Sequence, residues 1–125
     1  MCAGDFTTLF LSDKIRFALN SAELSSDISG YLDKIASLAK GCENFQITID
    51  GHADRSGNEI INDELADDRA ESVRAALVER GVPADHLITH GYGEERPFDP
   101  GNNREAYRQN RRVDLGFKEQ STAKN

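Results

Sequence analysis

Apolar and polar residues alternate along one short stretch of the chain, where Phe45, Ile47 and Ile49 are separated by single polar residues. A period of two places these three side chains on one face, as in a strand that packs against a core. The following residues, 51–57, are polar and are bounded by two glycines, which predicts a loop. We therefore expect a strand with one buried face that ends in a polar loop.

Over residues 58–80 the apolar positions recur with helical spacing and fall on one side of the helix when residues are placed at about 100° per position. Arg69 and Asn62 lie at the centre of that apolar side. A buried guanidinium needs an acceptor, because isolated buried charge is costly. The nearest supply of negative charge is Asp54 in the preceding loop. Asp54, Asn62 and Arg69 therefore form a candidate constellation, which is either a structural clasp or a ligand site.

The remaining pattern predicts further elements: a short helix over residues 5–11, a strand over 14–19, a helix from Ser25 or Ser26 to Gly41, a strand over 87–89, a loop over 94–103, a short helix over 104–109 and a strand over 113–117. The strand at 87–89 follows a helix crossover, which predicts a parallel, right-handed connection. We expect an α+β fold of βαβαβ type, with a mixed sheet of about four strands and two main helices packed on one face. The domain should span residues 15–117, between an N-terminal segment (1–14) with the short helix and a disordered polar tail (118–125).

Charge and hydropathy narrow the possible partners. The 125 residues carry a formal net charge of −7. This argues against a nucleic-acid or anionic-membrane partner, since such binding depends on basic surface. No apolar run approaches the length of a membrane span, and no signal peptide is recognised, so we expect no direct membrane insertion by this domain.

Catalytic and metal chemistry find little support in the sequence. His52, Asp54 and His90 could meet at the ends of neighbouring strands, but a hydrolytic or metal site would also need a nucleophile or a third firm ligand. The loop at 51–57 lacks the motifs of phosphate loops. Cys2 and Cys42 have no second thiol or histidine at metal-ligand spacing. We therefore expect no enzyme activity, no metal and no cofactor.

Several motifs resemble one known family. GHAD at 51–54, a following glycine, Asn62, Leu65 and Arg69-Ala70 look like the core of the OmpA-like C-terminal domain, the peptidoglycan-binding module of outer-membrane and stator proteins. The resemblance covers about residues 15–117, and its further motifs, in family order, are Phe17, NSAEL at 20–24, GVP at 81–83, HGYGEERP at 90–97 and NRRV at 110–113. Residues 92–112 are similar in particular to the peptidoglycan-associated lipoprotein branch.

The resemblance implies a ligand and a role for each site residue. In this family the bound group is the free end of a diaminopimelate side chain in the stem peptide, which carries an ammonium and a carboxylate on one carbon. By resemblance, Asp54 takes the ammonium and Arg69 takes the carboxylate, which agrees with the need of a zwitterion for one acceptor and one bidentate donor. The further residues implied are Asn20 and Asn62, as hydrogen-bonding groups, and Arg111 or Arg112, beside the peptide.

The function implied is non-catalytic binding of peptidoglycan, which anchors the outer membrane or an envelope complex to the wall from the periplasm. The alternative is a structural domain that docks another envelope protein or dimerises. We expect the export signal and any anchor to lie outside this sequence. Ala53, Ile61 and Ala66 replace the frequent Thr, Tyr and Ser of the family pattern, which affects peripheral contacts and not the central pair.

The resemblance also bears on the two cysteines. Cys2 could carry a lipid, but a lipid-bearing cysteine begins a mature chain, whereas here it follows Met1. We favour a disulfide between Cys2 and Cys42, because some OmpA-like domains look as if they carry such a pair. It would tie the N-terminal segment to the end of the first main helix and, in the chain-entropy model, add roughly 4 kcal/mol. Two free thiols in a reduced compartment are the third interpretation.

Overall fold

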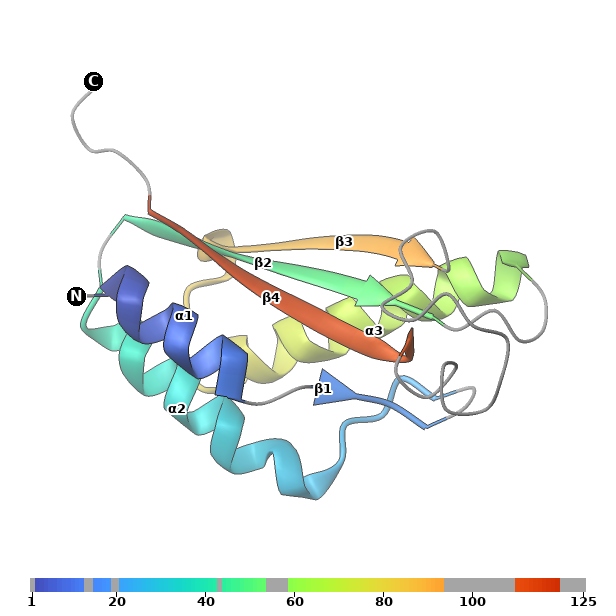
Figure 1. Cartoon of the computed structure of the whole chain (residues 1–125), viewed down its shortest axis with the longest axis horizontal. Helices are drawn as coiled ribbons and strands as arrows, with labels where there is room; N and C mark the ends of the chain where they lie inside the picture. Colours follow the sequence, from blue (N-terminus) through green and yellow to red (C-terminus); the bar gives the residue numbers. More distant parts are fainter. Residues whose placement is uncertain are drawn as a thin grey trace.

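The computed structural model describes residues 2–12, 15–18, 21–42, 44–53, 59–93 and 110–119. Within these residues three α-helices combine with one mixed sheet (Figure 1). The α+β class predicted from the sequence is therefore confirmed. In chain order the elements are α1 (Cys2–Ser12), β1 (Ile15–Arg16), the 3-10 turn η1 (Ser26–Ile28), α2 (Ser29–Lys40), β2 (Phe45–His52), α3 (Glu59–Glu79), the 3-10 turn η2 (Ala84–His86), β3 (Leu87–Gly93) and β4 (Arg112–Glu119).

The strands of the described residues lie in the order β1-β4-β2-β3. β2 pairs in parallel with β3, where Ile49 faces Thr89, and antiparallel with β4, where Ile49 faces Leu115. β1 pairs antiparallel with β4 through Ile15 and Val113. α3 is the crossover between β2 and β3, because parallel neighbours cannot be joined by a tight turn. The predicted parallel connection and the mixed sheet are both confirmed.

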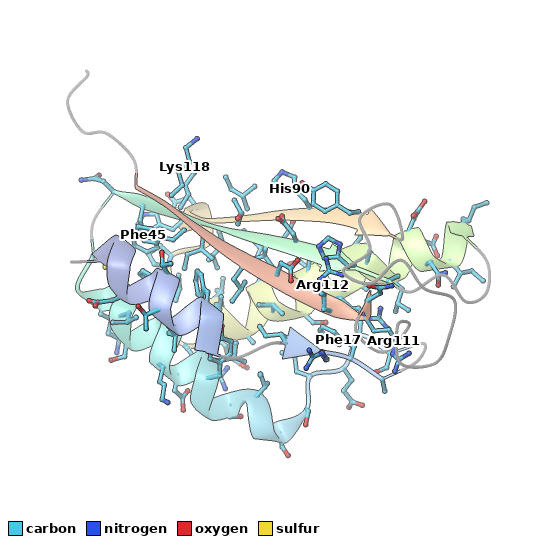
Figure 2. The ribbon with its side chains drawn as sticks, in the orientation of Figure 1. Phe17, Phe45, His90, Arg111, Arg112 and Lys118 are labelled. Carbon is cyan, nitrogen blue, oxygen red and sulfur yellow. The ribbon has the colours of Figure 1, made fainter. Side chains whose placement is uncertain are left out.

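The core lies between the sheet and the helices. Figure 1 shows the helices on one side of β2, β3 and β4, and Figure 2 shows His90 and Lys118 directed to the other side. Phe45, Ile47 and Ile49 are at most 1% exposed, so the alternation identified in the sequence marks the buried face of β2. Their partners in the core from the two main helices include Leu32, Ile35, Val73 and Leu77.

The end of β2 lies very close to the N-terminal half of α3. A Cβ atom at Gly51 would collide with the carbonyl group of Ala66, and its register partner Gly91 on β3 would collide with Asp67. Two neighbouring positions of the sheet therefore lack side chains where the helix passes over them. This contact brings the C-terminal end of β2 against the part of α3 that carries the predicted site.

β1 is shorter than predicted. The pattern over residues 14–19 indicated a strand, but β1 comprises only Ile15–Arg16. Beyond it, side chains hold the backbone. The Nε group of Arg111 donates to the Phe17 carbonyl at 3.0 Å, and Nη2 of Arg69 donates to the Ala18 carbonyl at 3.0 Å. Two guanidinium groups therefore satisfy carbonyl oxygens that a longer strand would have paired with backbone.

Four other elements are longer than predicted. β2 runs to His52, so residues 51 and 52 of the predicted loop belong to the strand. α1 covers residues 2–12, and its fully buried Phe6 stacks on Phe117 of β4 with ring centroids 4.7 Å apart. β3 continues to residue 93 and β4 to residue 119, beyond the predicted limits of 89 and 117. The last two residues of β4, Lys118 and Glu119, pair through their backbone with the first two residues of β2. Their polar side chains do not prevent this pairing, because the backbone groups alone form the hydrogen bonds. The predicted loop at 94–103, the helix at 104–109 and the tail from residue 120 lie outside the described residues.

Candidate ligand site

Arg69 is the centre of the candidate site. It is fully buried, and its guanidinium donates three hydrogen bonds to backbone carbonyl oxygens. Nε donates to Ser21 at 2.8 Å, Nη1 to His52 at 3.0 Å and Nη2 to Ala18 at 3.0 Å. The guanidinium carbon lies 5.3 Å from the ring centroid of Phe17, a cation–π distance. The predicted inward position of Arg69 is confirmed.

The acceptors of Arg69 were not predicted. The acceptor predicted from the sequence was Asp54. Asp54 lies outside the described residues, as does the rest of the loop at 54–58. The acceptors of Arg69 that lie among the described residues are main-chain groups from two distant parts of the chain. No sequence signal marks them, because every residue carries a carbonyl and only the tertiary fold decides which ones converge.

α3 presents Arg69 beside a second buried polar residue. Asn62 is 4% exposed and lies two turns before Arg69 on the same face. Ala66 and Ala70, both fully buried, occupy the positions between and beside them. Small residues at these positions let β2 approach, so the polar part of the α3 face meets the end of β2. The predicted pairing of Asn62 and Arg69 on one buried face is confirmed.

A second side chain of α3 holds the segment formed by residues 18–22. The hydroxyl group of Ser72 donates to the Ala22 carbonyl at 2.6 Å, one turn beyond Arg69. Asn20 belongs to this segment and lies outside the described residues, but Ala18 and Ser21 on either side of it both accept hydrogen bonds from Arg69. α3 therefore contacts the backbone before and after Asn20.

Arg111 and Arg112 point to different sides of the sheet (Figure 2). Arg111 lies beside Phe17: its Nε donates to the Phe17 carbonyl, and its own carbonyl accepts from the Phe17 amide, both at 3.0 Å. Arg112 is 7% exposed, and its Nε lies 3.1 and 3.0 Å from the two carboxylate oxygens of Asp114. Arg111 is therefore linked through Phe17 to the surroundings of Arg69.

Arg112 belongs to a polar cluster on the face of the sheet opposite the helices. Asp114 also lies 3.3 Å from Nε2 of His52, whose ring stacks on Tyr92 with centroids 5.5 Å apart. Burial raises the pKa of Asp114, but the hydrogen bond from His52 and the charge of Arg112 outweigh it and hold the pKa below its usual value of 3.8. His90 contacts a different carboxylate, that of Asp50, at 3.2 Å.

This arrangement separates the histidines that the sequence grouped as a possible metal or general-base site. His52 faces Asp114 and His90 faces Asp50, while Asp54 is not described. Within the described part of the chain, no group of three or more His, Cys, Asp or Glu residues is placed to hold a metal ion.

Comparison with known proteins places the chain in a family. The model of the OmpA family matches residues 16–111, which include β2, α3, Arg69 and Arg111. The chain belongs to the OmpA family. The match also contains Phe17, Ala18, Ser21 and His52, which contact Arg69.

The relatives of this OmpA-family domain are proteins of the bacterial envelope. The chain is 37% identical over 109 residues to a peptidoglycan-associated lipoprotein of Rhizobium meliloti, covering 87% of this chain and 61% of that protein. It is 36% identical over 101 residues to the peptidoglycan-binding protein ArfA of Mycobacterium bovis, covering 81% and 31%. It thus spans less than two thirds of the length of these curated relatives. The crystal structure of the peptidoglycan-associated lipoprotein from Burkholderia pseudomallei has the same fold, with a TM-score of 0.80, 28% identity and coverage of 87% and 93%.

The cysteines of this OmpA-family domain lie near one end of the helix pair. Cys42 follows α2, is 9% exposed, and its Sγ lies 3.2 Å from the Leu38 carbonyl oxygen. Cys2 is the first residue of α1, and its side chain is outside those described. Figure 1 shows the start of α1 and the end of α2 at the same end of the molecule, and the two helices are in contact. The predicted disulfide stays a prediction.

Proposed function

We propose that this domain binds peptidoglycan without catalysis, through the diaminopimelate zwitterion of the stem peptide, and so attaches the outer membrane or an envelope complex to the wall. The observation that carries the proposal is the buried guanidinium of Arg69, which contacts the backbone of Ala18, Ser21 and His52, residues close in sequence to Asn20 and Asp54. The names of the relatives, peptidoglycan-associated and peptidoglycan-binding, support it.

Each polar residue has a role in this proposal. Asp54 accepts hydrogen bonds from the ammonium group, and Arg69 attracts the carboxylate, because its positive charge stays at the site whichever acceptors its N–H groups face. Asn62 and Asn20 supply further hydrogen bonds. Arg111 is favoured over Arg112 as the residue beside the peptide, since Arg111 contacts Phe17 and Phe17 contacts Arg69.

The proposed place of action is the periplasm, next to the outer membrane. No helix in the described ranges is long and apolar enough to cross a membrane. The proposal assigns wall binding to this domain. Binding alone requires no cofactor or metal.

A sacculus pull-down tests the proposed function. Purified sacculi should retain the domain. Free diaminopimelate should release it, because the sacculus and free diaminopimelate compete for the same proposed binding site. Arg74→Lys is a matched control for Arg69→Lys, since Arg74 lies on the same helix but donates only to the exposed Ala84 carbonyl and contacts Glu71 at 3.5 Å. The proposal would be refuted if sacculi did not retain the domain, or if free diaminopimelate did not release the retained domain.

A second candidate function, docking to an envelope protein or dimerisation, is favoured by a separate observation. Ile60 and Ile61, in the first turn of α3, are 72% and 57% exposed. Neighbouring large apolar residues on a surface are a feature of protein contacts. Sedimentation equilibrium of the parent and of an Ile60→Ser/Ile61→Ser variant tests dimerisation: a dimer lost in the variant supports self-association through these residues, and a monomeric parent refutes it.

A further inference from the structure

We propose that Arg69 and Ser72 are positioning residues, which hold the backbone around Asn20 and before Asp54 so that these two side chains reach the ligand. This inference rests on the proposed function and adds a second role to Arg69, beyond attraction of the ligand carboxylate. It assigns to Ser72, which no motif of the sequence singled out, a part in ligand binding without ligand contact.

Distant parts of the backbone converge on the side chain of Arg69. Ala18 and Ser21 lie 51 and 48 positions from Arg69 in the sequence, and His52 lies 17 positions away. Distances of 2.8–3.0 Å are those of well-formed hydrogen bonds, and a guanidinium donor strengthens them. Because the guanidinium is planar and rigid, its three contacts fix the two segments relative to each other and not only to the helix.

Few backbone bonds hold the described residues 18, 21 and 22. Among the described residues, β1 pairs with β4 only through Ile15 and Arg16, the Phe17 amide donates to the Arg111 carbonyl, and the Ser21 amide donates to the Ala18 carbonyl at 3.3 Å. The carbonyl groups of Ala18, Ser21 and Ala22 then accept hydrogen bonds from side chains of α3. In this region side chains of one helix therefore replace the ladder of a sheet.

The carbonyl groups bound by Arg69 are close in sequence to the two proposed ligand-binding residues, Asn20 and Asp54. The two carbonyls of the first segment lie on either side of Asn20, and the His52 carbonyl belongs to the second residue before Asp54. A displacement of about 1 Å in a binding group is enough to lose most of its contribution. Loss of these hydrogen bonds should therefore weaken every contact made by Asn20 and Asp54, including contacts to the ammonium group.

Two ligands that differ by one group separate positioning from direct contact. Lysine has the side-chain ammonium of diaminopimelate and lacks the carboxylate beside it. If Arg69 only binds the carboxylate, Arg69→Lys lowers the affinity for a diaminopimelate-containing stem tripeptide and leaves the affinity for the matched lysine-containing tripeptide unchanged. If Arg69 positions Asp54 and Asn20, Arg69→Lys lowers the affinity for both tripeptides.

Ser72 provides the second variant, and it does not depend on the charge of Arg69. Ser72→Ala removes the hydrogen bond to the Ala22 carbonyl and no group that could contact the ligand in the proposed site. We expect Ser72→Ala to weaken the diaminopimelate tripeptide by roughly two- to tenfold, as one neutral hydrogen bond allows. Ser72→Thr keeps the hydroxyl group and should restore the affinity.

The experiment is isothermal titration of both tripeptides into the parent, Arg69→Lys, Ser72→Ala, Ser72→Thr and the control Arg74→Lys, with amide hydrogen exchange of residues 18–23 on the same samples. We expect weaker binding and faster exchange in Arg69→Lys and Ser72→Ala, and neither change in Ser72→Thr or Arg74→Lys. Unchanged affinity of the diaminopimelate tripeptide in Ser72→Ala overturns the positioning role and leaves the proposed function standing. If the parent itself does not bind the diaminopimelate tripeptide, the proposed function fails, and the inference fails with it.

Discussion

Replacement of Arg69 by lysine measures how much of the fold depends on the guanidinium. A residue that served only the ligand would leave stability nearly unchanged. Arg69 is instead fully buried, and it donates to the carbonyl oxygens of Ala18, Ser21 and His52. Lysine keeps the charge, but its ammonium is a single point at the end of a flexible chain and cannot reproduce a planar set of donors that reaches three separated acceptors.

The magnitude follows from the number of carbonyls that lose their partner. A buried polar group left without a hydrogen bond costs about 1–3 kcal/mol. Of the three acceptors, only the His52 carbonyl belongs to a buried residue, whereas Ser21 is half-buried and the Ala18 carbonyl also accepts from the Ser21 amide at 3.3 Å. Arg69→Lys should therefore destabilise the domain by about 1–3 kcal/mol, the cost of one buried acceptor. For a domain of this size about 1 kcal/mol corresponds to roughly 3–6 °C, so the melting temperature should fall by about 3 °C or more.

Thermal and urea unfolding, followed by far-ultraviolet circular dichroism, provide the measurement. Arg74→Lys carries the same substitution on the same helix at a half-exposed position, and should melt within about 2 °C of the parent. A melting temperature of Arg69→Lys equally close to the parent, with an unchanged urea m-value, would show that the three hydrogen bonds contribute little. The role of Arg69 as an organiser of the fold would then be wrong.

Three further predictions follow from single groups. Asp54→Asn keeps the shape of the side chain and removes its charge, so sacculus binding should weaken by roughly ten- to a hundredfold with little change in melting temperature, and equal binding would contradict the role of Asp54. Thiol titration of unfolded, unreduced protein from an exporting host should find no free thiol, whereas two free thiols would refute the disulfide between Cys2 and Cys42. The pKa of Asp114 is lower in the folded protein than in the unfolded chain, so the unfolded chain takes up the proton at higher pH. The contribution of Asp114 to stability is therefore present above the ordinary carboxyl pKa of 3.8 and is lost as the pH falls through the pKa of the folded protein. The parent should therefore be more stable than Asp114→Asn at neutral pH, and the difference should disappear on acidification below pH 3.8, as urea unfolding at several pH values would measure.

Patterns confined to one element were predictable from the sequence. The burial of Phe45, Ile47 and Ile49 follows from their alternation alone, since the period of a strand does not depend on what packs against it. The inward position of Arg69 was predictable for the same reason: a single charged residue interrupts the apolar face of a helix and must be buried with it. These inferences need only the geometry of the element that carries the residue.

Features that depend on how elements meet were not predictable. The period of a strand already places Arg112 and Asp114 on one face, but only the pairing of β4 with β1 decides that Arg111, the residue before β4, reaches the Phe17 carbonyl. The short length of β1 has a similar cause, because side chains from α3 and Arg111 take over its carbonyl groups. Ser72 gave no signal, since a serine on the flank of a helix is common and its partner, the Ala22 carbonyl, is 50 positions away.

At the end of β2, the same close contact between strand and α3 determines both the packing of the core and the geometry of the site. Gly51 lacks the side chain that would collide with the Ala66 carbonyl, so the last residues of β2 lie directly against α3. The His52 carbonyl follows immediately and lies 3.0 Å from Nη1 of Arg69. Any side chain at Gly51 that pushed strand and helix apart would lengthen that bond at the residue from which the chain enters the loop of Asp54. The glycine of the GHAD motif therefore acts on the site through the distance between strand and helix, and the same close contact that fills the core sets where the proposed ammonium-binding loop begins.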